Sequence, residues 1–366
     1  MRFQIPMSLV NGSSALTRRQ ALGWGLACCG TVMAATTDAR LERPRLSLAV
    51  GGRFSLQHLP LAVAEHLGYF KSEGLDVIVQ EFPSAFRAQQ AALSGGADLV
   101  AGVYEQTIAL QDRNQYFQSF VLQTRAPQIA FGVSSRTLPG FQGVADLKGR
   151  KIGVSAPGSS TDMVVNLVLA RAGLKPSDVR IIAVGNAQGA LAAVRSGQID
   201  ALCNPDPVMT QLEQSGEVRV VADARSLKGN LELFGGSMPS SCLLGAVEFI
   251  TRNPSTCQAL AHALVRALAW LQQAGPGDVL KALPDAYLGP DRGLFLAAFH
   301  RCREAWSPDG MMPDDGPRTA LQVLAGFDEN LRPEKIELPK TFTNEFSRRA
   351  RDRWRPSEGR LLTGYS

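Results

Sequence analysis

The sequence contains few of the residues from which catalytic and metal sites are usually built. Its 366 residues include only four histidines and six cysteines. The sequence contains no G-x-S-x-G, H-E-x-x-H or G-x-x-x-x-G-K-S/T pattern. It therefore gives no indication of a serine hydrolase, a zinc protease or a P-loop nucleotide-binding protein. His58 and His66 have no His, Cys or carboxylate partner at metal-ligand spacing. We therefore expect no metal, no cofactor and no catalytic activity.

Cysteine use is equally uninformative about chemistry. Two of the cysteines, Cys28 and Cys29, lie near the N-terminus. The spacing of the other four neither fixes a disulfide pairing nor matches a metal site. Because an unpaired cysteine often acts as a small core residue, we expect buried thiols. These four are Cys203, Cys242, Cys257 and Cys302.

The sequence also lacks a long hydrophobic run and a strong excess of one charge. The weakly apolar run from Ala21 to Ala35 is shorter than the about 20 residues that span a bilayer. There are 38 Lys and Arg residues against 33 Asp and Glu residues. A nucleic-acid or membrane partner therefore has no support from charge. The basic run from Arg348 to Arg355 is interpreted as a solvated helix face.

The N-terminus predicts export. The arginine pair Arg18-Arg19 stands directly before the apolar run, no acid precedes Asp38, and residues 32–34 (VMA) offer a small-residue cleavage site. Residues 1–35 are therefore predicted to be a twin-arginine signal peptide, and the mature protein to be periplasmic. The alternatives are an internal amphipathic helix and a lipid anchor at Cys28 or Cys29.

After the predicted signal, strands and helices alternate, which favours parallel sheets covered on both faces. The first unit has expected strands at 46–50, 76–82, 98–101, 117–123 and 129–134. The second has expected strands at 151–154, 180–184, 201–203 and 218–222, and the chain then returns through 238–244. We assign residues 45–134 and 238–346 to a first lobe, 135–237 to a second lobe, and 347–366 to a basic C-terminal tail. Hinge closure around a ligand suits two lobes joined in this way.

The most informative segment runs from Asp146 to Asp200. In it, a short strand at 151–154 leads into the turn Gly158-Ser159-Ser160-Thr161, and a helix follows. Ser and Thr at a helix start cap free backbone N–H groups. A helix N-terminus also carries a partial positive charge, so this turn suits the oxygens of an anion.

Four sequence blocks resemble the solute-binding proteins of ABC importers, in the branch for nitrate, sulfonate, taurine and thiamine precursors. They are residues 61–77 (LAVAEHLGYFKSEGLDV), 92–98 (ALSGGAD), 147–154 (LKGRKIGV) and 193–201 (AVRSGQIDA). The resemblance implies a type II periplasmic-binding-protein (venus-flytrap) fold of the α/β class, in which each lobe is a mainly parallel sheet flanked by helices. It also implies a monomer that delivers a small solute to a permease and its ATPase in the inner membrane.

In sheets of this kind, ligands bind beyond the carboxyl ends of the strands, and the family usually places its ligand contacts there. The positions expected to bind the solute are Arg53, Phe54, Ser84, Tyr104, Glu105, Arg125, Ser159, Ser160, Thr161, Asn186, Asn204 and Asp206. The arginines can clamp an oxyanion, the hydroxyls can donate hydrogen bonds, and the aromatic rings can pack on the solute.

Each role has a structural alternative. The hydroxyls can be helix caps, the arginines can be solvated or ion-paired, and Phe54 and Tyr104 can fill the edge of a lobe. Glu105 and Asp206 can pair with the arginines or bind an amino or ring N–H group. A zwitterion such as an aminosulfonate, or a polar heterocycle, therefore fits as well as nitrate.

The expected function is uptake of a small oxyanion-bearing organic solute, such as a sulfonate, taurine or nitrate. The alternatives are uptake of a thiamine pyrimidine precursor or another heterocycle, a binding protein that reports to a membrane sensor, and an enzyme like the thiamine-pyrimidine synthases. Those enzymes share the fold but carry a cysteine-rich motif that this sequence lacks.

Overall fold

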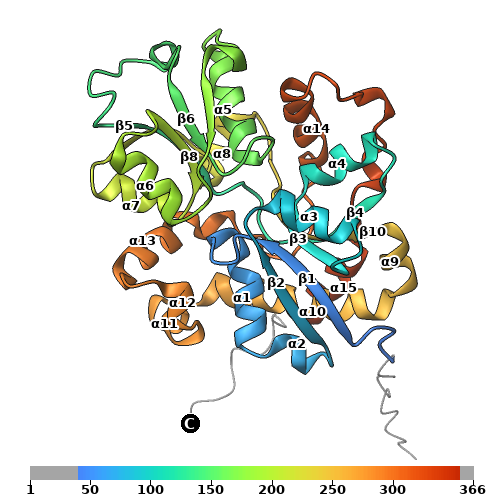
Figure 1. Cartoon of the computed structure of the whole chain (residues 1–366). Helices are drawn as coiled ribbons and strands as arrows, with labels where there is room; N and C mark the ends of the chain where they lie inside the picture. Colours follow the sequence, from blue (N-terminus) through green and yellow to red (C-terminus); the bar gives the residue numbers. More distant parts are fainter. Residues whose placement is uncertain (1–39, 355–366) are drawn as a thin grey trace, which may run out of the picture. The chain divides into compact units, whose positions relative to one another are not determined.

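The computed structural model describes residues 40–354. The predicted signal peptide and residues 355–366 of the predicted tail lie outside the described residues. Within residues 40–354 the chain forms two five-stranded sheets flanked by helices (Figure 1). No helix in this part of the chain is long and apolar enough to cross a membrane.

The first sheet has the strand order β2-β1-β3-β10-β4. Its strands are β1 (Arg45–Gly51), β2 (Asp76–Phe82), β3 (Leu99–Val103), β4 (Phe117–Leu122) and β10 (Ser241–Ala246). Strand β1 is parallel to β2 and β3, whereas β10 is antiparallel to β3 and β4. The flanking helices include α1 (Leu59–His66), α2 (Tyr69–Ser72), α3 (Ala85–Leu93) and α4 (Glu105–Asp112).

The second sheet has the strand order β7-β6-β8-β5-β9. Its strands are β5 (Ile129–Ser134), β6 (Lys151–Val154), β7 (Arg180–Ala183), β8 (Ala201–Pro205) and β9 (Val218–Asp223). Strand β6 is parallel to β7 and β8, and β5 is antiparallel to β8 and β9. The flanking helices are α5 (Ser160–Arg171), α6 (Gln188–Ser196), α7 (Val208–Gln214) and α8 (Leu227–Phe234).

Strand β5 corrects the predicted boundary between the lobes. The sequence assignment ends the first lobe at residue 134, but the backbone of 129–134 pairs with β8 and β9 of the second sheet. The physical reason is the register. Ile129 lies opposite Pro205, and Ala130 lies between Asn204 and Asp223, so β5 fills the gap between two strands of that sheet.

The C-terminal third of the described chain is mostly helical, and it packs on the first sheet and on helices of both units. It contains α9 (Val247–Arg252), α10 (Pro254–Gln273), α11 (Pro276–Ala282), α12 (Asp285–Leu288), α13 (Arg292–Cys302), α14 (Gly316–Phe327) and α15 (Glu345–Trp354). Residues 347–354, predicted as a tail, belong to α15 and pack on α10. Phe346, Ser347 and Ala350 are buried, and the Ser347 hydroxyl donates to the Phe120 carbonyl at 2.9 Å. This part of the predicted tail is therefore a docked helix.

The chain passes between the sheets twice, and the two connecting segments are hydrogen-bonded to each other. The amide of Gln123 donates to the Ser241 carbonyl at 2.7 Å, and the amide of Ser240 donates to the Thr124 carbonyl at 3.1 Å. Near the second segment, the side chain of Arg225 is fully buried between the carboxylates of Asp206 and Asp223. Two adjacent connections of this kind are the usual form of a hinge.

Cys203, Cys242, Cys257 and Cys302 are all buried, and none of them forms a disulfide within residues 40–354. Burial raises the pKa of Cys242 and of Cys257 to about 12. Burial likewise raises the pKa of Cys203 and of Cys302. These thiols are part of the core, because their side chains lie among buried residues of both sheets.

Candidate solute-binding site

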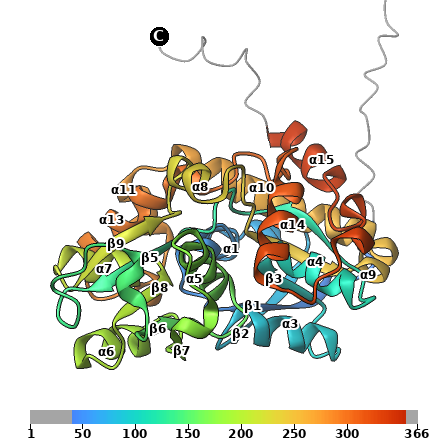
Figure 2. The ribbon, with the colours of Figure 1, turned by 90° about the horizontal axis from the view of Figure 1, so that it is seen from above.

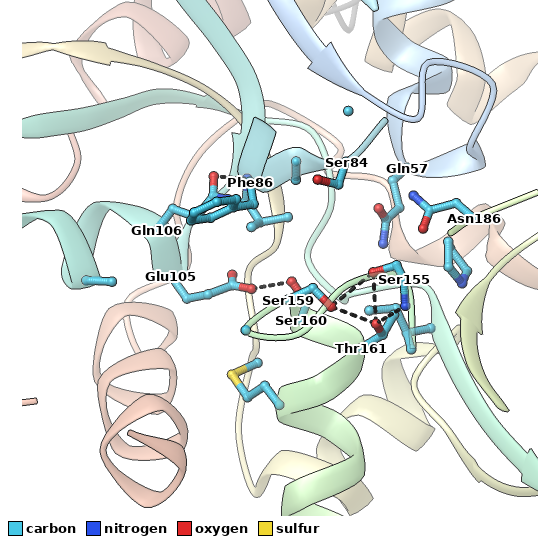
Figure 3. A pocket seen from close by; sticks show the side chains of 18 of the residues that line it. Gln57, Ser84, Phe86, Glu105, Gln106, Ser155, Ser159, Ser160, Thr161 and Asn186 are labelled. Carbon is cyan, nitrogen blue, oxygen red and sulfur yellow. Dashed lines mark hydrogen bonds between the residues drawn. The ribbon is translucent and has the colours of Figure 1, made fainter. Parts of the chain in front are cut away.

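A cavity lies where the carboxyl ends of strands from both sheets meet; we call it the cleft cavity (Figure 3). Its volume is about 100 Å³. Its walls come from the end of β1, the first turns of α3 and α4, the turn before α5, and the loop after β7. Helix α14 covers one side, where it contacts α5 (Figure 2). Six of the predicted positions line the cavity, namely Ser84, Glu105, Ser159, Ser160, Thr161 and Asn186.

Glycine at the end of β1 makes the first wall possible. A Cβ atom on Gly51 would lie 2.1 Å from the backbone nitrogen of Ala85, closer than real Cβ contacts occur. Only glycine therefore lets the start of α3 approach the strand so closely. Ser84 caps this helix, because its hydroxyl accepts from the amide of Arg87 at 3.3 Å. The cap holds Ser84 at the cavity wall.

Three hydroxyls at the start of α5 form a cluster of mutual hydrogen bonds. Ser155 Oγ lies 3.0 Å from Ser159 Oγ and 2.9 Å from Thr161 Oγ1, and the latter two are 2.8 Å apart. Ser159 also accepts from the amide of Asp162 at 3.4 Å, so the predicted capping role is confirmed. Contact between these hydroxyls and a solute stays a prediction.

Glu105 is the most unusual group in the cavity. It begins α4, is only 7% exposed, and its Oε1 accepts from the Ser160 hydroxyl at 2.5 Å. This hydrogen bond joins the start of α4 to the start of α5 across the cavity (Figure 3). Its Oε2 is buried without a hydrogen-bond partner among the described residues. Burial raises the pKa of Glu105, and the bond from Ser160 only partly opposes that shift. A buried oxygen of this kind is costly unless something pairs with it.

The cleft cavity contains no lysine or arginine among its described lining residues. Its two ionisable lining residues are Glu105 and His58. His58 is 3% exposed, its Nδ1 lies 3.2 Å from Ser241 Oγ, and burial lowers the pKa of its imidazole to about 4. His58 is therefore uncharged at neutral pH. An oxyanion in this cavity would rely on neutral donors and on the N-terminus of α5.

The predicted arginine clamp is not at the cavity. Arg53 donates through Nε to the Tyr287 hydroxyl at 2.7 Å and through Nη2 to Glu65 at 2.5 Å. Arg125 donates through Nη2 to the Glu304 carbonyl at 3.0 Å. Neither arginine lines the cleft cavity. Both side chains turn to partners within the protein, which is the structural alternative for these residues.

Three further predicted positions are also turned away. Tyr104 is fully buried in the core, and its hydroxyl lies 2.6 Å from Thr341 Oγ1. Asn204 donates to the Gly185 carbonyl at 2.9 Å and so holds the loop that carries Asn186. Asp206 accepts from the amide and hydroxyl of Thr210 and pairs with Arg225 at 3.5 Å. Burial raises the pKa of Asp206, and Arg225 opposes that shift. All of these contacts are internal.

A second cavity, which we call the side cavity, has a volume of about 520 Å³. The predicted residue Phe54 lines it, together with residues of α6, α7, α12 and α13. Asn186 lines both cavities. Phe54 thus lies on the same side of the fold as Asn186, in a separate cavity from Glu105.

Several cavity residues were missed from the sequence. Gln57, His58, Phe86 and Gln106 lie within a few residues of predicted positions, so a wider window beyond each strand end would have included them. Leu324 and Phe327 come from α14, which lies far from any strand end in the sequence. No strand-end signal points to them.

The two sheets and the cavity between their strand ends define the class of the protein. This is the two-lobed type II periplasmic-binding-protein fold that the sequence predicted. The family model described as NMT1/THI5 like matches residues 55–274. The chain belongs to this NMT1/THI5-like family, which confirms the predicted relationship.

Solved structures and a sequence relative agree with this placement. A protein from Bordetella bronchiseptica RB50 is 48% identical, covers 86% of this chain and 99% of its own, and superposes with a TM-score of 0.83. The alkanesulfonate-binding protein SsuA from Xanthomonas axonopodis pv. citri, bound to MOPS, is 20% identical with a TM-score of 0.66; the match covers 82% of this chain and 98% of SsuA. YtlA of Bacillus subtilis (strain 168), provisionally named a binding protein, is 23% identical over 79% of this chain and 86% of its own.

Proposed function

We propose that this protein is the periplasmic substrate-binding component of an ABC importer. In this proposal the solute is captured in the cleft cavity, and the units built on the two sheets close around it as lobes. The fold, the family and the placement of the cavity between two strand-end surfaces support it. The two hydrogen-bonded connections between the sheets provide the hinge.

The chemical class of the solute is inferred from Glu105, one of whose buried carboxyl oxygens has no hydrogen-bond partner among the described residues. A carboxyl group with one oxygen unsatisfied is stabilised by an N–H donor, and the part of the chain that the structure describes places no arginine or lysine at the cavity to neutralise a lone anion. The N-terminus of α5 favours an oxyanion. We therefore propose a small solute that carries both an amino group and an oxyanion, such as an aminosulfonate. SsuA is named for binding alkanesulfonates, which is consistent with this class.

A polar heterocycle with a ring N–H, such as a thiamine pyrimidine precursor, is the second candidate. It is favoured by Phe86, whose ring lines the same cavity as Glu105 and can pack on a flat ring. Nitrate offers no N–H group to Glu105, so the geometry favours it least. In either case the proposed contacts are Ser84, Glu105, Ser159, Ser160, Thr161 and Asn186.

The proposal includes the rest of the transport system. The protein is exported through its twin-arginine signal, acts as a monomer, and passes its solute to a permease and ATPase of the inner membrane. It binds the solute and does not transform it. Capture depends on the closed state having the higher affinity, because both lobes contact the solute only when they are shut.

Thermal shift and titration calorimetry on the mature protein test the solute class. The probes are taurine, an aminopyrimidine and nitrate, and a ligand that binds only the native state raises the melting temperature. We expect taurine to bind, and Ser160→Ala to weaken it about two- to tenfold through loss of one hydrogen bond. Ser135→Ala is the matched control, because Ser135 is exposed and lines neither cavity. Binding of nitrate alone would contradict the proposed solute.

A further inference from the structure

The side cavity is larger than the cleft cavity, and its walls combine apolar and polar side chains. Its volume of about 520 Å³ compares with about 100 Å³ for the cleft cavity. Sites for small organic ligands usually measure about 300–1,000 Å³. Apolar side chains from both units line it, namely Phe54, Leu191, Val208, Tyr287, Leu288 and Leu294, and the carboxylates Glu81 and Asp291 line it as well.

The two cavities are neighbours. Gly51 lines the cleft cavity, its neighbour Gly52 lines the side cavity, and Asn186 lines both. A Cβ atom on Gly52 would lie 2.8 Å from Asn186 Nδ2, so glycine is what allows the two segments to approach here. Asn186 Oδ1 is buried without a hydrogen-bond partner among residues 40–354. The two cavities therefore share a small polar partition with unused hydrogen-bonding capacity.

The aromatic wall of the side cavity is fixed in place. Phe54 is 43% exposed, and its ring forms a T-shaped pair with that of Tyr287, with the centroids 4.9 Å apart. The Tyr287 hydroxyl accepts from Arg53 Nε at 2.7 Å, and Arg53 is itself held by Glu65. A large aromatic side chain that is exposed yet braced in this way is a preorganised surface for an apolar partner.

We propose that the side cavity binds an apolar ring or alkyl chain of the same solute whose polar head lies in the cleft cavity. The inference rests on the proposed function for that head. A cavity of about 100 Å³ accommodates only the head of an organic solute, and the side cavity adjoins it at Asn186 and offers the apolar side chains of Phe54 and Leu294 to the rest of the molecule. The solute class is then an amino oxyanion with a hydrophobic substituent on its nitrogen or carbon chain.

The test compares taurine with N-cyclohexyltaurine by titration calorimetry. Burial of the ring should raise affinity about tenfold or more over taurine, because each buried methylene group adds a factor of about four. Leu294→Trp fills the side cavity from α13, and Gln211→Trp fills it from α7. Both tryptophan variants should abolish the gain in affinity that the cyclohexyl ring provides. Leu231→Trp is the matched control, because Leu231 is 58% exposed on α8 and lines neither cavity.

A neutral probe distinguishes a failure of the side-cavity inference from a failure of the proposed aminosulfonate head. Cyclohexanol binding is followed by saturation-transfer NMR, and melting curves verify that each variant is folded. Loss of the cyclohexanol signal in Leu294→Trp, together with its displacement by N-cyclohexyltaurine and not by taurine, supports the inference. No affinity gain for N-cyclohexyltaurine, or a gain that survives both tryptophan variants, overturns it. Cyclohexanol bound alongside N-cyclohexyltaurine also overturns it, because the side cavity would then hold a separate molecule.

If neither sulfonate binds but cyclohexanol does so in a Leu294-dependent way, the apolar site stands and the proposed aminosulfonate head is wrong. If taurine binds and cyclohexanol does not, the proposed function stands and the side cavity has no such role.

Discussion

Replacing Glu105 by glutamine should make the protein more stable and a weaker binder at the same time. Glutamine keeps the shape of the side chain and can still contact the Ser160 hydroxyl, but it carries no charge. In the native protein the carboxyl is buried, one of its oxygens has no hydrogen-bond partner among the described residues, and burial raises its pKa above 4.5. Burial of the ionised carboxyl group therefore lowers the free energy of unfolding, and the variant removes this destabilisation.

The size and the pH dependence of this effect follow from linkage. For an acid whose pKa is raised on folding, its contribution to stability is complete below the unfolded pKa and is lost as pH rises through the folded pKa. Wild type and Glu105→Gln should therefore be equally stable near pH 4. At pH 8 the variant should gain about 1–3 kcal/mol, because it replaces a buried carboxylate by a neutral amide, and a buried unsatisfied group costs more when it is charged. For a chain of this length, the gain corresponds to a melting temperature higher by roughly 1–2 °C per kcal/mol.

Binding should change in the opposite direction. Loss of a hydrogen bond to a charged group costs about 1.5–3 kcal/mol, so the affinity for taurine should fall about 10- to 150-fold. Melting curves between pH 4 and pH 8, together with calorimetric titrations, measure both effects. Glu329→Gln is the control, because Glu329 is exposed and lines neither cavity. A variant less stable than wild type at pH 8, or a stability difference that does not depend on pH, would refute the reasoning.

Three further substitutions test separate parts of the structure. Gly51→Ala should lower the free energy of unfolding by about 3 kcal/mol or more in urea titrations, because its Cβ would collide with Ala85; an unchanged midpoint would contradict the close approach. Asp206→Ala should cost about 3 kcal/mol by leaving Arg225 with fewer partners, yet leave taurine affinity within about twofold; a tenfold affinity loss would return Asp206 to the site. The pKa of His58 falls from 6.5 to about 4 on burial, so stability should be lost as pH drops below 6.5, by about 2 kcal/mol at pH 5. His58→Gln should remove that loss, and an equally acid-sensitive variant would show that other groups cause it.

The sequence predicted much of the fold because the pattern of strands and helices is local. The strands at 76–82 and 151–154 have the bounds expected from their apolar pattern. The antiparallel direction of β10 and the membership of β5 in the second sheet depend on contacts between distant residues. Periodicity carries no information on which strand will become a neighbour. Helix α14 was missed for a related reason, since its place over the cleft is set by tertiary packing.

The candidate site was predicted to the level of the loop, and less well to the level of the side chain. Strand-end reasoning reached Ser84, Glu105 and Ser160, because the position of a strand end fixes where its next residue lies. It did not foresee that Arg53 and Tyr104 would lie outside the lining of the cleft cavity, because the direction of a side chain depends on the partner it finds. Those partners, Tyr287 and Thr341, are 234 and 237 residues away in the chain.

The four buried thiols have a consequence for how the protein ages and is handled. Reaction with oxidants and alkylating agents requires the thiolate, and burial keeps these side chains protonated and out of reach. In an oxidising compartment they should therefore persist unmodified for as long as the chain is folded, without any bond between them. Modification of Cys203, Cys242, Cys257 or Cys302 becomes a record of past unfolding. The number of these four thiols that react with an alkylating agent therefore measures how much of a preparation has unfolded.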